Sequence, residues 1–124
     1  MVNRGIRGAT TVINNEETEI LRETVVLLRE IVERNNVIAE DISNVWITMT
    51  NDLDATFPAR AIREIEGWEM VPLMCSTEIP VKGSLPMCIR LMVQFNTDKS
   101  QREIRHVYLN EAQKLRPDLS QSKS

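Results

Sequence analysis

Apolar residues recur along this chain with two spacings, one typical of helices and one typical of strands. The helical spacing is clearest between positions 20 and 32, where it involves Ile20, Leu21, Thr24, Leu27, Leu28, Ile31 and Val32. Because residues three and four apart share one helix face, this pattern predicts an amphipathic helix that ends at Asn35 and Asn36. Asn14, with Glu17 three residues later, predicts the start of the helix as an approximate capping box.

Alternation of apolar and polar residues predicts strands on both sides of this helix. The predicted strands cover residues 2–12, 44–50, 68–76 and 87–95. Pro72 cannot donate a backbone hydrogen bond, so it predicts that the third strand lies at a sheet edge or contains a bulge. A short helix is predicted over 59–66, because Pro58 suits a first helical turn and Gly67 suits a C-terminal cap.

The predicted order of elements is β-α-β-α-β-β, followed by a short segment of undetermined type over residues 103–109. This order predicts an α+β fold in which both helices pack on one face of a single mixed sheet. At 124 residues and 42% hydrophobic composition, the chain has enough apolar surface for one core. We therefore expect a single domain over 1–118 and a polar, mobile C-terminal tail over 119–124.

Arg90 lies in the middle of a strand that is otherwise apolar. The core face of that strand carries Ile89, Leu91, Val93 and Phe95, and the other face carries Cys88, Met92 and Gln94 together with Arg90. A guanidinium group stays charged, and burying it without a partner costs several kcal/mol. The sequence therefore predicts a carboxylate partner for Arg90, from this chain or from a bound molecule. Because two helices cover only one face of the sheet, we expect the face with Arg90 to contact another subunit.

The charged residues limit the classes of partner. The net charge of −3 argues against a broad nucleic-acid surface. Arginine accounts for 11 of the 15 basic residues, which favours local recognition of carboxylate or phosphate groups. No apolar stretch approaches the roughly 20 residues of a membrane helix, and the N-terminus lacks an apolar signal core, so we expect a cytoplasmic protein. No metal site is expected, because the chain has one histidine, His106, and its two cysteines do not have zinc-ligand spacing.

Several candidate residues have an ordinary structural interpretation when taken singly. Cys75 lacks a neighbouring histidine that could make it a nucleophile, so a small buried thiol is expected there. Arg60 is expected to form a helical ion pair with Glu64. Residues 5–8, Gly-Ile-Arg-Gly, are similar to a loop that clamps single-stranded RNA, but that loop joins two helices and this segment lies in a strand. The two glycines around Arg7 instead favour close approach of the backbone to a neighbour or a ligand.

Taken together, these residues resemble the monofunctional chorismate mutases of the trimeric, pseudo-α/β-barrel class. The resemblance runs from about residue 4 to residue 119, nearly the whole chain. It is carried by RGIRGATT (4–11), FPARAIR (57–63), CIR (88–90), IRHVYL (104–109) and LRPDL (115–119). Several specific strings in the same order and spacing make this resemblance far more specific than any single motif.

The resemblance implies a homotrimer whose three subunits form a pseudo-α/β barrel, with active sites in the clefts between neighbouring subunits. It implies an isomerase that converts chorismate to prephenate by an intramolecular Claisen rearrangement, on the route to phenylalanine and tyrosine. The family uses no metal and no cofactor. The reaction needs neither proton transfer nor a nucleophile, which agrees with the lack of histidine-based machinery. Chorismate and prephenate are the expected small-molecule partners, and no nucleic acid or membrane partner is expected.

The resemblance also assigns roles to residues. Arg90 would contact the ether oxygen and a carboxylate, Arg7 would bind one of the two substrate carboxylates, and Tyr108 would donate to a carboxylate. Glu78 would accept a hydrogen bond from the ring hydroxyl, with Cys75 beside that hydroxyl as a polar neighbour. The other substrate-binding residues that it implies are Phe57, Ala59, Arg60, Arg63, Leu73, Met74, Leu115 and Arg116.

Within this set, Phe57, Ala59 and Leu115 would form walls that hold the substrate in its reactive conformation. Arg63 and Arg116 would add positive potential that attracts a dianion. The family divides its site between two subunits. One subunit contributes Phe57, Arg63 and Cys75, and its neighbour contributes Arg7, Glu78, Arg90 and Tyr108.

Two positions depart from the family pattern. Arg60 stands where lysine is expected, which keeps the charge. Met74 stands where a small polar residue is more usual, which keeps any backbone contact but not a side-chain contact. A second hypothesis stays open from the residues alone, that of a non-catalytic trimeric sensor that binds a small carboxylate in the same cleft. Glu78 argues for the enzyme, because its carboxylate hinders capture of a dianion but suits a reacting ring that carries a hydroxyl.

Overall fold

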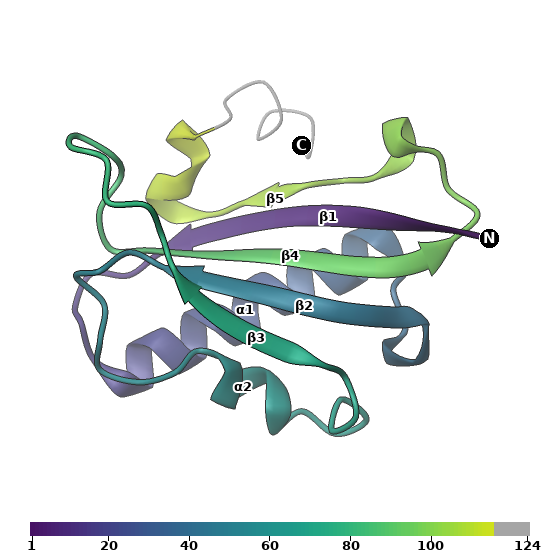
Figure 1. Cartoon of the computed structure of the whole chain (residues 1–124), viewed down its shortest axis with the longest axis horizontal. Coiled ribbons are helices and arrows are strands. Elements are labelled where there is room, and N and C mark those ends of the chain that lie inside the picture. Colours follow the sequence, from purple (N-terminus) through teal and green to yellow (C-terminus); the bar gives the residue numbers. More distant parts are fainter. Residues whose placement is uncertain (116–124) are drawn as a thin grey trace.

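Five strands form one sheet, and two helices cover one of its faces, in the computed structural model of this chain, which describes residues 1–115 (Figure 1). The strands are β1 (Val2–Thr11), β2 (Ile42–Met49), β3 (Leu73–Thr77), β4 (Cys88–Thr97) and β5 (Val107–Tyr108). The helices are α1 (Glu17–Asn35) and α2 (Ala59–Arg63), and short 3-10 helices occur at Ala39–Asp41, Gln101–Glu103 and Asn110–Lys114. The predicted order is confirmed, and the undetermined segment supplies β5.

The strand order across the sheet is β3-β2-β4-β1-β5. Strand β4 runs antiparallel to β1 and β2, whereas β3 is parallel to β2 and β5 is parallel to β1, so the sheet is mixed as predicted. The predicted edge position after Pro72 is confirmed, since β3 pairs only with β2 among the described strands. The predicted start at Trp68 is wrong, because residues 68–72 form turns. The Trp68 N–H donates to the Ile65 carbonyl, and the indole is buried in the core.

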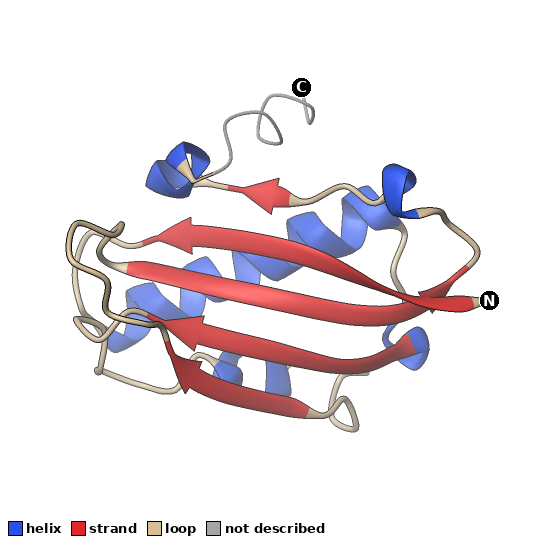
Figure 2. Cartoon of the chain, turned by 45° about the horizontal axis from the view of Figure 1, so that its top comes forward, coloured by secondary structure: helices blue, strands red, loops and turns tan. Residues whose placement is uncertain are grey.

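The core lies between the sheet and the helices, which Figure 2 shows on the same side of the strands. It joins Ile20, Leu27, Leu28 and Ile31 of α1 to the predicted core face of β4, Ile89, Leu91, Val93 and Phe95, all of which are buried. Gly8 allows α1 to approach β1 closely. A Cβ atom at Gly8 would lie 2.5 Å from Cδ1 of Ile31 and 3.2 Å from Cδ1 of Leu27, so even alanine would force these side chains to move.

The start of α1 differs from the prediction. Asn14 is not the N-cap, because the helix begins at Glu17 and Glu16 occupies the cap position without a side-chain hydrogen bond. The Glu19 carboxylate instead accepts hydrogen bonds from the backbone N–H groups of Ile13, at 2.5 Å, and Asn14, at 3.2 Å. The bond from Ile13 is the main cause that lowers the pKa of Glu19. One carboxylate within the first turn therefore holds the connection between β1 and α1.

The predicted end of α1 is confirmed. Asn36 adopts a left-handed conformation with φ of 52°, and its N–H donates to the Val32 carbonyl. The preceding Asn35 side chain is completely buried and connects the helix to the segment before β5. Its Nδ2 donates to the carbonyls of Ile31 and Arg105, both at 2.9 Å, and its Oδ1 accepts from the Arg105 N–H at 2.8 Å. Asn35 thus fixes the segment that continues into β5.

We expect Asn35→Ala to lower the free energy of unfolding by about 2–4 kcal/mol, because it leaves both backbone groups of Arg105 without their bonds to Asn35. Urea denaturation of the purified protein measures this difference. Asn51→Ala is the matched control, since Asn51 is exposed in a turn, and its effect should stay within about 0.5 kcal/mol. Equal midpoints for the two variants would contradict a stabilising role for the buried amide.

Helix α2 is shorter than predicted. It ends at Arg63 with Glu64 as its C-cap, and Gly67 follows in a turn with φ of 91°. The predicted pair between Arg60 and Glu64 is wrong. Arg60 Nη1 instead donates to Glu17 Oε2 at 2.8 Å and to the Thr56 hydroxyl at 3.0 Å, which connects α2 to the start of α1.

Candidate functional site

The sheet face opposite the helices carries the residues that the sequence analysis singled out around Arg90. Strand pairing aligns Thr48 of β2 with Arg90, Arg90 with Ala9 of β1, and Ala9 with Tyr108 of β5. Arg7 pairs with Met92 one step along the same face. Arg7, Thr48, Glu78, Arg90 and Tyr108 line a cavity of about 190 Å³ together with Gly8, Trp46, Leu91 and Met92. The sheet therefore gathers residues from five separate parts of the chain into one hollow.

The predicted carboxylate partner of Arg90 is Glu78. Arg90 Nη1 lies 3.4 Å from Glu78 Oε1, and the two side chains are 41% and 22% exposed, so the pair is reachable from solvent. Glu78 follows directly after β3, where its backbone N–H donates to the Met49 carbonyl at 2.9 Å. The Thr48 hydroxyl donates to Glu78 Oε2. Thr48 and Met49, two consecutive residues of β2, therefore hold Glu78 beside Arg90. Oε1 of Glu78 faces the guanidinium.

Tyr108 forms the inner wall of this hollow. It is completely buried and packs in a small cluster with Ala9, Cys88 and Ala112, against which Leu115 also packs. Burial raises the pKa of the Cys88 thiol to about 11, so this cysteine stays protonated at neutral pH. Cys88 is therefore a packing residue beside Arg90 and not a nucleophile.

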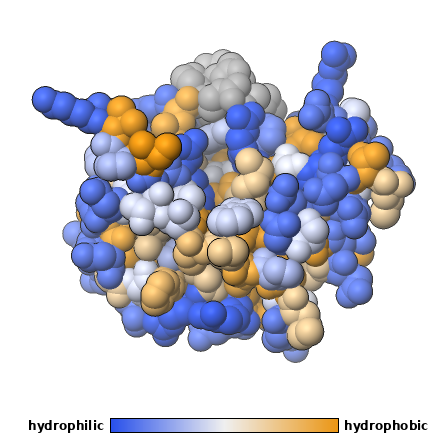
Figure 3. Space-filling view, viewed as in Figure 1, coloured by the Kyte–Doolittle hydropathy of each residue, from blue (hydrophilic) through white to orange (hydrophobic). Residues whose placement is uncertain are grey.

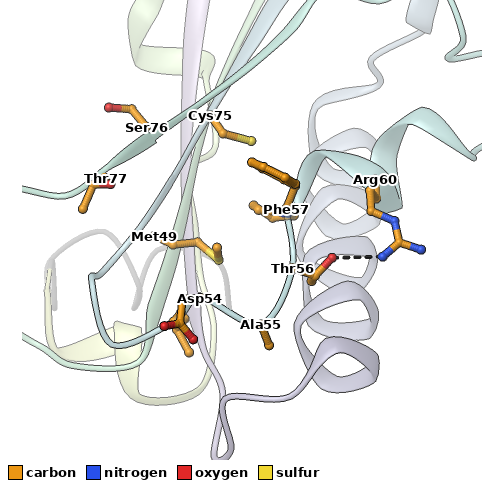
Figure 4. Close-up of a pocket in the computed structure, with 11 residues that line it drawn as sticks. Met49, Asp54, Ala55, Thr56, Phe57, Arg60, Cys75, Ser76 and Thr77 are labelled. Carbon is orange, nitrogen blue, oxygen red and sulfur yellow. Dashed lines mark hydrogen bonds between the residues drawn. The ribbon is translucent and has the colours of Figure 1, made fainter.

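A second, larger cavity lies at the β3 edge, on the helix side of the sheet. It has a volume of about 540 Å³ and is lined by Phe57, Arg60 and Cys75 with residues of the loop before α2 (Figure 4). The Cys75 sulfur points toward the Phe57 ring in this view, and Phe57 is 70% exposed. The expectation of a buried Cys75 thiol is wrong, because β3 is an edge strand and leaves this side chain exposed.

The two cavities have no lining residue in common. Cys75 pairs with Ile47, whose side chain is in the core, whereas Ser76 pairs with Thr48 on the face of Arg90. Since successive side chains of a strand point to opposite faces, Cys75 and Arg90 do not share a cavity within one chain. The structure thus brings Arg7, Glu78, Arg90 and Tyr108 together and places Phe57, Arg60 and Cys75 in a separate group.

The remaining predicted site residues are distributed around these two groups. Ala59 is buried in α2, Arg63 is exposed at the end of α2, and Leu73 is half-buried at the start of β3. Met74 is exposed next to Trp46 on the open face, and Leu115 packs against the Tyr108 cluster. The prediction for Arg116 lies outside the described residues.

Thr48 is a site residue that the sequence analysis missed. Alternation in its strand places it opposite Ile47, which indicates its face, but a threonine on a polar face has no distinctive signal. Its partner Glu78 is 30 residues away, and only the parallel pairing of β2 with β3 brings the two side chains together.

The open face also carries exposed apolar side chains. Trp46 is 43% exposed, Met74 is 59% exposed and Met92 is 36% exposed. Figure 3 views this face and shows pale and orange residues over the strands, with many of the blue, hydrophilic residues around the rim. Contiguous apolar area of this kind favours contact with another protein surface.

Within residues 1–115, no group of three or more histidine, cysteine, aspartate or glutamate side chains could hold a metal ion. Among these residues, neither helix has the length and apolar character needed to cross a membrane.

Known proteins share both the sequence and this fold. A family model for type I chorismate mutases matches residues 3–119. Chorismate mutase AroH of Bacillus subtilis (strain 168) is 49% identical over 124 residues, covering 100% of this chain and 98% of that protein. Chorismate mutase AroH of Thermus thermophilus is 47% identical over 117 residues, covering 94% of this chain and 95% of that protein. A solved chorismate mutase structure from Clostridium thermocellum matches with a TM-score of 0.86 and 51% identity, covering 89% of this chain and 97% of that chain. This chain belongs to the type I chorismate mutase family.

Proposed function

We propose that this chain is a chorismate mutase whose active sites form between the subunits of a homotrimer. It converts chorismate to prephenate, in the synthesis of phenylalanine and tyrosine, and works in the cytoplasm. Family membership over nearly the whole chain supports the activity. The observation that carries the proposed site is the convergence of Arg7, Arg90 and Tyr108 around one carboxylate, Glu78, on the open sheet face.

Arg90 acts on the reacting oxygen. During the rearrangement an ether C–O bond lengthens while a C–C bond forms in the same molecule, and negative charge gathers on the ether oxygen. The guanidinium group is permanently protonated, and its pairing with Glu78 fixes its place before the substrate arrives. A fixed cation stabilises the charge-separated transition state more than the substrate, which lowers the barrier.

Arg7, Tyr108 and Glu78 bind and orient the substrate. Arg7 and Tyr108 lie on adjacent strands beside Arg90 and bind the two carboxylates of chorismate. Glu78 accepts a hydrogen bond from the ring hydroxyl through the oxygen that faces Arg90, since Thr48 already donates to the other oxygen. A folded, correctly oriented substrate reaches the transition state with less entropy left to lose.

A second copy of the chain completes the site. In this arrangement the group of Phe57, Arg60 and Cys75 closes over the Arg90 group of its neighbour, with Ala59 and Leu73 as apolar walls. Arg63 adds positive potential, and Leu115 supports Tyr108 from the same subunit. The exposed apolar residues of the open face support this contact, because Trp46, Met74 and Met92 would be covered in it. Arg116, by the family pattern, adds a further positive charge.

Two measurements test the proposal. Purified protein is mixed with chorismate, and the loss of chorismate absorbance is followed without added metal or cofactor. Sedimentation equilibrium gives the number of subunits. Conversion to prephenate by a three-subunit particle supports the proposal. Tight binding of chorismate without conversion would favour a carboxylate sensor instead, and a monomer with full activity would exclude the shared site.

We expect Thr48→Val to lower kcat/KM for chorismate by about tenfold to a hundredfold, because it removes a hydrogen bond to a charged carboxylate. Valine keeps the shape of threonine, so the sheet packing is preserved. Thr48→Ser is the matched control, as it retains the hydroxyl and should stay close to wild type. In a Glu78→Ala background the Thr48→Val change should have little further effect, and a full additional loss would contradict this role.

A further inference from the structure

His106, the single histidine of the sequence, lies beside the site, and its side chain bonds to the backbone of Arg7. His106 immediately precedes β5, and its Nδ1 accepts a hydrogen bond from the backbone N–H of Arg7 at 2.9 Å. The mechanism proposed above does not use this residue. Its side chain lines a separate cavity of about 470 Å³, which also contains Arg4, Arg7 and Gln101.

The contact stands where the pairing of β1 with β5 stops. The paired residues are Gly8 with Val107 and Ala9 with Tyr108, and the Leu109 N–H donates to the Ala9 carbonyl at 2.9 Å. One residue earlier, the Arg7 N–H finds its acceptor on the His106 side chain instead of on a strand backbone. The imidazole therefore extends the pairing by one bond, up to the residue whose side chain lines the Arg90 hollow.

We propose that His106 is a positioning residue for the reaction, acting through the backbone of Arg7 and resting on the role proposed for Arg7. By fixing the Arg7 N–H, it sets the direction in which the Arg7 side chain leaves β1 and so aligns the guanidinium with a substrate carboxylate. His106 also connects Arg7 to Tyr108, which follows His106 by two residues. The two carboxylate-binding side chains therefore keep a constant separation.

The chemistry of the contact requires one form of the imidazole. Nδ1 can accept a hydrogen bond only when it carries no proton, so His106 is neutral with its proton on Nε2. Arg4 and Arg7 line the same cavity as the imidazole. Asn35 binds both backbone groups of Arg105, the residue before His106, so the segment that carries the imidazole is itself held in place.

The first test uses the wild-type protein and the fact that it contains a single histidine. Nitrogen-15 NMR of histidine-labelled protein near neutral pH reports one imidazole, without the need for residue assignment. The expected result is a single Nε2–H tautomer, with Nδ1 giving the shift of an unprotonated nitrogen that accepts a hydrogen bond. A dominant Nδ1–H tautomer, or a fast average of both, would overturn the proposal.

The second test compares two substitutions of nearly equal shape. His106→Asn keeps an acceptor close to the Nδ1 position, and His106→Leu removes it. We expect His106→Leu to raise KM for chorismate by about tenfold with a smaller change in kcat, because the Arg7 N–H loses its partner and the carboxylate contact weakens. The KM of His106→Asn should stay within about twofold of wild type. If His106 served only in apolar packing, the polar asparagine would not preserve KM better than leucine.

The possible outcomes separate this role from the activity itself. If the wild-type protein does not convert chorismate, the proposed function fails, and the role of His106 fails with it. If the wild-type protein is active and His106→Leu has an unchanged KM, or if both variants lose affinity equally, only the positioning role is overturned. Melting temperatures of both variants are measured beside the kinetics. A rise in KM that only followed the loss of stability would also overturn the positioning role.

Discussion

Replacing Arg90 by glutamine is expected to lower kcat for chorismate conversion by about a thousandfold or more, because the transition state loses a fixed positive charge at the ether oxygen. Glutamine keeps hydrogen-bonding capacity but carries no charge, so the change tests electrostatics directly. Arg90→Lys is also expected to be poor, with a loss of about a hundredfold, since an ammonium group lacks the planar donor pair of a guanidinium. Initial rates from chorismate absorbance measure both changes.

The matched control for this prediction is Arg22→Gln on α1. Arg22 is exposed and pairs only with its neighbour Glu23 among the ion pairs of the described chain, far from the open face. Its kcat should stay at the wild-type value. Melting temperatures separate catalysis from folding, because Arg90 is 41% exposed and its loss should leave the core unchanged. Wild-type kcat in Arg90→Gln would remove the basis of the mechanism.

Mixed trimers provide the second prediction. One chain carries Arg90→Gln, which damages the open-face group of Arg7, Glu78, Arg90 and Tyr108. The other chain carries Phe57→Ala with Arg63→Ala, which damages the helix-side group, formed by Phe57, Arg60 and Cys75 together with Arg63. Each chain alone should have little activity. When equal amounts are unfolded and refolded together, about one quarter of the sites should combine two intact halves, because each site takes one half from each of two neighbours.

The control for this recovery of activity is a mixture of two chains that both carry a substitution in the open-face group. Chains with Arg90→Gln and chains with Glu78→Ala both lack part of the open-face group, so no combination of them rebuilds an intact site. Refolding them together should leave activity at the sum of the separate chains. Rescue in this control, or no rescue in the first mixture, would show that the two groups do not meet across a subunit boundary.

Much of the fold could be predicted from local patterns. The buried face of α1 and the alternation in β4 predicted the core, and Pro72 predicted the edge position of β3. The errors occurred at element ends, where a distant or unexpected group competes with the local signal. Glu19 holds the residues before α1 in place of an Asn14 cap, and Arg60 bonds to Glu17 instead of Glu64.

The candidate site could be predicted only in part. Arg90 was identifiable as a charge in an apolar strand, and the need for a carboxylate followed from the cost of leaving it unpaired. The identity of that carboxylate depends on the pairing of β2 with β3, which alternation alone does not specify. The exposure of Cys75 and the role of Thr48 depend on the same pairing. Strand register, therefore, is the information that the residues by themselves lacked.

The short pairing of β1 with β5 has a consequence for how the protein is made. β1 lies at the beginning of the chain, and its partner Val107–Tyr108 lies about a hundred residues later. During synthesis on the ribosome, every residue between β1 and β5 must emerge before this edge of β1 is occupied. Contacts between such distant segments form late, because the intervening chain must first be ordered. The nascent chain can therefore place Tyr108 beside Ala9 only after the ribosome has released all the residues that separate β1 from β5.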